Sequence, residues 1–377
     1  MAKIPRPRVY LPLRLRKVFD HLLILVGKFV IWLGRKLSVQ HSKETHYLAI
    51  ESGEVSWNFF EFQQILASAQ EHYGVNSVVT ISIKDRESYV EELRRFFSTH
   101  KVQTYLWDPR TLSEHWARSW IQAFAVAFLF AQHQITPIAK LTDVQVRRWR
   151  SQTALITASQ GVCVSIMEPG RAMRWAVHRN LVGPVPMPLS LQWLDSQSHS
   201  GSSDGATFAG VGTVRFVGSL YEPRRSFLNE LSERLAENSV QLEIFGRELS
   251  SRRLDVGTYL DLLRNSRIAV STSRPSVLVG QDRIEEGHLV WRFFEAMAMG
   301  IPLVAEFVPG AEHLFESGVH YLSFSDLDEA TLAVLEVVRD ADLAAKLGKA
   351  GQQRVREICE HHSFWHIVDE AVIGSGG

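Results

Sequence analysis

The chain has 377 residues, of which 45% are hydrophobic and 22% are charged, and its formal net charge is zero. This length suits two ordinary domains, and this composition excludes a disordered chain. The two cysteines, Cys163 and Cys359, have neither the spacing of a zinc motif nor that of a disulfide framework. We therefore expect a reducing compartment.

The first 45 residues differ in charge from the rest of the chain. They are rich in Lys and Arg and contain only two acids, Asp20 and Glu44, so the remaining residues are net acidic. A basic head on an acidic body indicates a local anionic partner and argues against general nucleic-acid binding.

An apolar run extends from Val18 to Gly34 but is interrupted by Asp20, His21 and Lys28. A membrane span needs about 20 apolar residues with few charges, so this run does not qualify, and no small-residue cleavage site of a signal peptide follows it. Two interpretations stay open. The run forms a basic helix in the interface of an anionic membrane, which would place the protein in the cytoplasm on the inner membrane face, or it packs on the body as an extra helix.

Residues 46–194 are predicted to form the first folded domain. We expect strands at 46–51, 77–83, 102–107, 135–141, 154–157 and 161–165, and helices at 58–72, 87–100, 116–130 and 144–150. Short apolar runs that alternate with helices are typical of parallel βαβ units. This pattern predicts a Rossmann-like N-terminal domain.

A stretch rich in Ser, Gly and Asp, residues 195–212, predicts a linker or a mobile loop. A second α/β series follows in residues 213–372. We expect strands at 213–217, 240–245, 268–272 and 302–305, and helices at 225–237, 259–265, 290–299, 329–339, 341–360 and 364–372. The predicted fold class is therefore α/β, with two doubly wound domains that face a cleft. Ligands of such sheets lie beyond the carboxyl ends of the strands.

The segment from Trp291 to Pro302 reads WRFFEAMAMGIP. It resembles the signature of group 1 glycosyltransferases of the GT-B fold, and in particular the subgroup related to spore-maturation glycosyltransferases. Other residues follow the order of that family across residues 213–372, namely Gly218 and Gly246 at strand ends, the helix–strand step at 259–270, and Ser363-Phe364-Trp365. The resemblance implies a nucleotide-diphosphate-sugar donor as co-substrate without a further cofactor. It also implies a glycan or lipid-linked acceptor in the synthesis of a cell-envelope polysaccharide or glycolipid.

The resemblance assigns the donor side of the cleft. Glu295 would accept hydrogen bonds from the ribose hydroxyls, and Arg292 lies one turn before it on the same face. Arg224 or Arg225 and the amides of a helix N-terminus can stabilise the diphosphate without a metal. Further candidates are Gly218, Gly246, Arg274, Gly287 and His288. The simpler alternatives are an ion pair between Arg292 and Glu295, solvated arginines, and glycines that only serve turns.

Three carboxylates are candidate catalytic residues. Glu286 lies nine positions before Glu295, whereas many retaining members of the family carry a glutamate eight positions before, so retaining or inverting stereochemistry stays open. Glu54 and Asp143 follow predicted strands of the first domain and would face the cleft as a base or an acceptor ligand, although Asp143 also suits a helix N-cap. The competing function is a non-catalytic GT-B-like protein that binds a sugar or a partner at the membrane.

Overall fold

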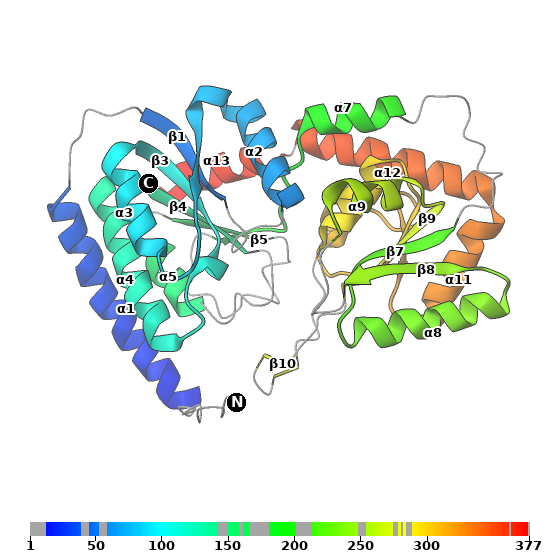
Figure 1. The fold of residues 1–377 in the computed structure, drawn as a ribbon, viewed down its shortest axis with the longest axis horizontal. Coiled ribbons are helices and arrows are strands. Elements are labelled where there is room, and N and C mark those ends of the chain that lie inside the picture. Colours follow the sequence, from blue (N-terminus) through cyan, green and yellow to red (C-terminus); the bar gives the residue numbers. More distant parts are fainter. Residues whose placement is uncertain are drawn as a thin grey trace.

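The computed structural model describes residues 13–38, 45–52, 59–141, 150–157, 161–165, 181–200, 213–247, 254–273, 278–279, 282–283, 289–361 and 363–375. These residues form two α/β domains, each built around a parallel sheet (Figure 1). The helix α1 (Leu13–Lys36) lies along the outside of the first domain. The prediction of two doubly wound domains is confirmed.

The N-terminal sheet has six parallel strands in the order β2-β1-β3-β4-β5-β6. Its strands are β1 (Thr45–Ser52), β2 (Val78–Ser82), β3 (Lys101–Trp107), β4 (Thr136–Leu141), β5 (Val162–Ser165) and β6 (Leu181–Val182). The helices are α2 (Phe59–Tyr73), α3 (Tyr89–Thr99), α4 (Trp116–His133), α5 (Arg150–Thr157) and α7 (Leu191–Ser200), with short turns at η1 (Val75–Ser77) and η2 (Pro109–Thr111). Because all six strands pair in parallel, their carboxyl ends lie at one edge of the sheet.

Two predictions for this domain were wrong. The strand expected at 154–157 is the last part of helix α5, because a short apolar run that is buried on all sides fits either a helix or a strand. The predicted linker begins too early, because α7 continues through Ser200, and residues 201–212 lie outside the described residues. Most of the helix expected at 144–150 also lies outside them.

The C-terminal sheet has five parallel strands in the order β13-β12-β9-β7-β8. They are β7 (Val214–Ser219), β8 (Leu242–Arg247), β9 (Ile268–Ser271), β12 (Leu303–Glu306) and β13 (Leu322–Phe324), and a separate hairpin joins β10 (Leu278–Val279) to β11 (Asp282–Arg283). The helices are α8 (Arg224–Glu237), α9 (Val256–Arg264), α10 (Trp291–Ala298), α11 (Leu327–Arg339), α12 (Ala341–His361) and α13 (Phe364–Ser375), with a turn at η4 (Ala311–His313). Strand β13 was not predicted because three residues are too few to show a period.

The last helix, α13, returns to the N-terminal domain. Its Asp369 carboxylate accepts hydrogen bonds from the hydroxyls of Tyr73 at 2.7 Å and Tyr47 at 3.2 Å. The indole of Trp365 donates to the hydroxyl of Ser68 at 2.9 Å. The last helix of the predicted C-terminal domain, residues 213–372, therefore packs on the N-terminal domain.

Helix α1 packs along α4 and α5 through a face that carries two glycines. A Cβ at Gly34 would lie 2.8 Å from the backbone oxygen of Phe128, and a Cβ at Gly27 would meet the side chain of Leu155. Ile31 is buried between them. The opposite face exposes Leu22, Leu25, Val26, Phe29, Trp32 and Leu33. Among the described residues, we find no helix that is long and apolar enough to cross a membrane.

Replacing Gly34 with leucine is expected to lower the free energy of unfolding by about 1–3 kcal/mol, because the new side chain collides with the backbone of α4. Urea unfolding measures the change. Gly374→Leu is the matched control, since a Cβ at this helical glycine meets nothing within 4 Å and leucine has the higher helix propensity. Equal effects of both substitutions would show that α1 does not pack on α4 in solution.

Candidate active site

Two glycines lie opposite each other where β7 and β8 end. Gly218 and Gly246 are register partners in the parallel ladder. A Cβ at Gly246 would lie 2.7 Å from the backbone oxygen of Gly218, and a Cβ at Gly218 would lie 2.2 Å from Nη2 of Arg292. The absence of a side chain at Gly218 therefore lets the Arg292 guanidinium lie directly against the backbone of β7, and Gly246 leaves room for that backbone and for Leu220.

Arg292 is a buried cation with an unused donor. Its residue is 9% exposed, and its guanidinium carbon lies 4.7 Å from the ring centroid of Phe216. Its Nε has no hydrogen-bond partner among the described residues. A buried, unpaired donor on a cation is costly unless a ligand satisfies it, so this arrangement suits an anion at the carboxyl edge of the sheet.

Glu295 lies on the same helix, α10, and is 3% exposed. The hydroxyl of Tyr259 on α9 donates a hydrogen bond to its carboxylate. Tyr259 also interacts with Arg292, and the charge of Arg292 lowers the pKa of Glu295, so the simpler alternative of an interaction between Arg292 and Glu295 stays open. Arg292 in addition lies against Gly218 of β7.

Burial raises the pKa of Glu295 from 4.5 to about 7. The hydrogen bond from Tyr259 and the charge of Arg292 oppose this rise, and the charge of Glu61 in the N-terminal domain adds to it. The carboxyl group therefore changes its charge near neutral pH. In its ionised form it can accept two hydrogen bonds from neighbouring hydroxyls.

The two arginines at the start of α8 donate hydrogen bonds to the backbone of the loop before that helix. Arg224 is 5% exposed, donates from Nη1 to the backbone oxygen of Ser219 at 3.1 Å, and has its guanidinium carbon 4.3 Å from the Tyr221 ring centroid. Arg225 donates from Nη2 to the backbone oxygen of Leu220 at 3.2 Å. Both arginines thus contact this loop, and the Arg224 guanidinium also lies 5.9 Å from the ring centroid of Phe216 on β7. A role of either residue in phosphate binding stays a prediction.

The remaining predicted site residues lie outside the described residues. They are the three catalytic candidates, Glu54, Asp143 and Glu286, and the donor-side candidates Arg274, Gly287 and His288. Of the twelve predicted site residues, the structure therefore brings together Gly218, Gly246, Arg292 and Glu295 and places Arg224 and Arg225 in the adjacent loop.

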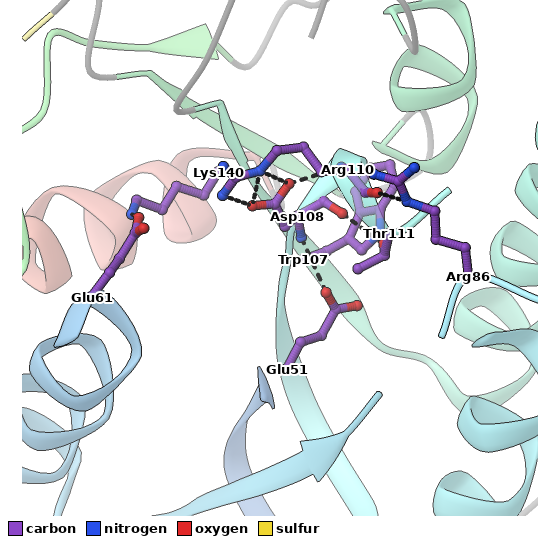
Figure 2. A network of polar contacts seen from close by, with 8 residues as sticks. All are labelled: Glu51, Glu61, Arg86, Trp107, Asp108, Arg110, Thr111 and Lys140. Atoms are coloured by element: carbon purple, nitrogen blue, oxygen red, sulfur yellow. Dashed lines mark hydrogen bonds and ion pairs between the residues drawn. The ribbon is translucent and has the colours of Figure 1, made fainter. Parts of the chain in front are cut away.

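Sequence reasoning missed a set of buried charges at the carboxyl edge of the N-terminal sheet (Figure 2). Lys140 of β4 is fully buried, and its Nζ lies 2.9 Å from Oε1 of Glu61 on α2. Asp108, the residue after β3, accepts hydrogen bonds from Nε of Arg110 at 2.9 Å and 3.0 Å. One feature of the sequence could have indicated these buried charges, namely a charged residue at the end of an apolar strand, as in the run Pro137-Ile138-Ala139-Lys140.

Glu51, near the end of β1, belongs to the same edge (Figure 2). It is fully buried, and its Oε1 accepts hydrogen bonds from the hydroxyls of Tyr89 at 2.6 Å and Tyr105 at 2.9 Å. Burial raises the pKa of Glu51 from 4.5 to about 8, although both tyrosine hydrogen bonds act to lower it. This carboxyl group is therefore mostly protonated at neutral pH.

Residues 224–372 match the family described as glycosyl transferase-like. This match covers the C-terminal half only, and comparison with solved structures shows that the chain has the GT-B fold. Two solved structures show the fold over nearly their whole length. HepE of Anabaena, in complex with UDP-glucose, is 12% identical with a TM-score of 0.54, and the match covers 88% of this chain and 99% of that one. Sucrose-phosphate synthase of Thermosynechococcus elongatus is 12% identical with a TM-score of 0.54, covering 86% and 97%.

A comparison with curated protein sequences gave no match. The match begins at residue 224, so it includes α10 with Arg292 and Glu295 but not β7 with Gly218. The position of β7 beside α10 is therefore known from the fold and not from the family match. The expected GT-B fold is confirmed, the expected family agrees with the match of residues 224–372, and the spore-maturation subgroup stays a prediction.

Proposed function

We propose that this GT-B protein is a glycosyltransferase that moves a sugar from a nucleotide-diphosphate-sugar to a glycan or lipid-linked acceptor of the cell envelope. The observation that carries the proposal is the buried Arg292 guanidinium against Gly218, with Glu295 on the same helix. Both lie at the carboxyl edge of a parallel sheet, where ligands of such folds bind. The Anabaena protein of the same fold was solved with UDP-glucose, which supports a donor of this class.

The chemistry requires positive charge at the leaving group. When the bond between the anomeric carbon and the diphosphate oxygen breaks, the diphosphate takes the electron pair. A buried guanidinium stabilises this charge more strongly than it would in water, and Arg292 is the described side chain best placed for it. Glu295 would hold the ribose hydroxyls. The acceptor hydroxyl gives its proton to a base, for which Glu54, Asp143 and Glu286 remain the candidates.

Incubation with a panel of nucleotide-diphosphate-sugars, followed by detection of free nucleoside diphosphate, tests the proposal. Turnover with at least one donor is expected. Tight binding of a nucleoside diphosphate without turnover of any donor, in the presence of cell-envelope glycans, would favour the non-catalytic alternative.

We also propose that the reaction needs no divalent ion, because arginine side chains supply the positive charge. Turnover in excess EDTA should therefore equal turnover in its absence. Magnesium or manganese added back after EDTA serves as the control. Activity that disappears with EDTA and returns with either metal would contradict this part of the proposal.

The acceptor side of the proposal includes a membrane. The outward face of α1 exposes Leu25, Phe29 and Trp32 by 61%, 61% and 52%, beside the exposed Lys28, Arg35 and Lys36. Apolar side chains flanked by cations suit the interface of an anionic bilayer. We therefore propose a cytoplasmic protein that lies on the inner face of the membrane.

Replacing Phe29 with glutamate should weaken binding to anionic vesicles about tenfold or more, because the loss of one buried apolar side chain costs about 1.5–3 kcal/mol. Co-sedimentation with vesicles measures it. Leu332→Glu on α11 is the matched control, since Leu332 is 67% exposed on the other domain. Vesicle binding unchanged by Phe29→Glu, or lowered equally by both, would remove α1 as the contact surface.

A further inference from the structure

Contacts of several elements join the domains. Helix α13 crosses to the N-terminal domain through the hydrogen bonds of Trp365 and Asp369, and α7 pairs with α12 through Asp195 and Arg356. In addition, Trp291, the first residue of α10, meets two residues of the N-terminal domain. The ring centroid of Phe60 lies 6.2 Å from that of Trp291, edge to face, and Nζ of Lys140 lies 5.4 Å from the Trp291 centroid.

Lys140 is held rigidly at this contact with Trp291. It is fully buried, pairs with Glu61 at 2.9 Å, and lies over an indole, the ring that attracts cations most strongly. Figure 2 shows Lys140 and Glu61 extended toward each other from different elements, β4 and α2. Buried ion pairs contribute little net stability compared with apolar residues of the same volume. The Lys140–Glu61 pair is therefore better explained by the residue that it keeps in position than by a contribution to stability.

The residue held in place is Trp291, which begins the helix of the donor site. Arg292 follows it directly, and Glu295 lies one turn later. The nearness of the two sites is also evident from the charge of Glu61, which raises the pKa of Glu295 across the domain boundary. A shift of Trp291 would move the first turn of α10 and the guanidinium that lies against Gly218.

We infer that Lys140 is a positioning residue that fixes the N-terminal domain against the first turn of α10. Held by Glu61, its ammonium lies over the Trp291 indole and sets the placement of α10 relative to the N-terminal domain. Without this contact, the Phe60 ring still lies beside Trp291, and α13 and α7 still join the domains, but the cation over the indole at the start of α10 is lost. The position of α10 relative to the N-terminal domain is then less restricted. The inference concerns domain placement, and only its consequence for nucleotide binding rests on the proposed function.

The test is the distance between spin labels on the two domains. Val75 in η1 and Leu332 on α11 are 66% and 67% exposed, whereas the native Cys163 and Cys359 are 0% and 8% exposed, so Val75→Cys and Leu332→Cys can be labelled selectively. The labelled parent protein should give one narrow distance distribution, and Lys140→Met should broaden it. Lys140→Arg should restore the narrow distribution, because arginine keeps a cation over the indole.

Two further variants separate positioning from a general loss of stability. Lys140→Met combined with Glu61→Gln leaves no unpaired buried charge and should broaden the distribution as the single variant does. Arg215→Met breaks another ion pair, with Glu243 at 2.7 Å, away from α10, and should leave the distribution narrow. A narrow distribution in the double variant would overturn the inference, even if Lys140→Met alone failed to fold.

A titration with UDP distinguishes this inference from the proposed function. If the parent protein binds UDP, Lys140→Met should lower the affinity several-fold, while Lys140→Arg and Arg215→Met should not. If the parent protein does not bind UDP, the donor assignment with that nucleotide fails, and the label distances still decide whether Lys140 positions the domains. Equal losses of affinity in Lys140→Met and Arg215→Met would count against positioning.

Discussion

Glu51→Gln should remove a large part of the pH dependence of stability. The pKa of Glu51 is about 8 in the folded state against 4.5 for the free side chain, because the carboxyl group is fully buried. Between these values the unfolded state releases a proton that the folded state keeps, so the free energy of unfolding falls as the pH rises. With about 1.4 kcal/mol per pKa unit, the fall is roughly 5 kcal/mol between about pH 4.5 and pH 8.

Glutamine keeps an acceptor for the hydroxyls of Tyr89 and Tyr105 but cannot ionise. Urea unfolding at about pH 5 and pH 8 should therefore show a much smaller fall for the variant than for the parent protein. Glu91→Gln is the control, since the side chain of Glu91 is 60% exposed on α3. If the parent protein and Glu51→Gln lose the same free energy of unfolding over this range, Glu51 does not titrate as the structure implies.

Arg292→Met and Glu295→Ala should each weaken nucleoside diphosphate binding about tenfold or more. A hydrogen bond that involves a charged group contributes about 1.5–3 kcal/mol, and Arg292 and Glu295 are both buried at the carboxyl edge of the sheet. In the parent protein, affinity should also rise as the pH increases through about 7, because the Glu295 carboxyl group then ionises and gains acceptor capacity. Glu295→Ala should lose this rise. Isothermal titration measures both effects.

Melting temperature serves as the folding control for these variants, because alanine keeps the helix propensity of α10. Arg267→Met is a matched arginine substitution, since Arg267 donates to the backbone oxygen of Val338 rather than facing Gly218. Folded Arg292→Met and Glu295→Ala proteins that bind nucleotide as tightly as the parent would remove these residues from the site.

The spacing of apolar residues predicted most of the fold. In most strands and helices this spacing continues over enough residues to distinguish one from the other. The failures have physical reasons. Residues 154–157 are buried on all sides in a helix, so their apolar run has no polar face to reveal its period. The three-residue β13 is stabilised by pairing with β12, and such pairing depends on residues distant in sequence.

The sequence predicted members of the site but not their contacts. Arg292 and Glu295 belong to one helix signature and were found from it, and Gly218 was named as a further candidate. The contact of Gly218 with Arg292 and the hydrogen bond from Tyr259 to Glu295 were not predicted, because only the fold brings β7, α9 and α10 together. Lys140 was assigned to a strand interior, where an isolated lysine carries no signal until its partner on α2 is known.

Hydrogen exchange with and without a nucleoside diphosphate tests the central claim most directly, namely that the nucleotide binds between β7 and α10. The ligand is whichever of UDP, GDP, ADP and TDP binds most tightly in titration. The predicted result is slower exchange in the segments 218–225 and 291–298, which contain Gly218 and Arg292. No binding of any of the four, or slower exchange confined to other segments, would contradict the account.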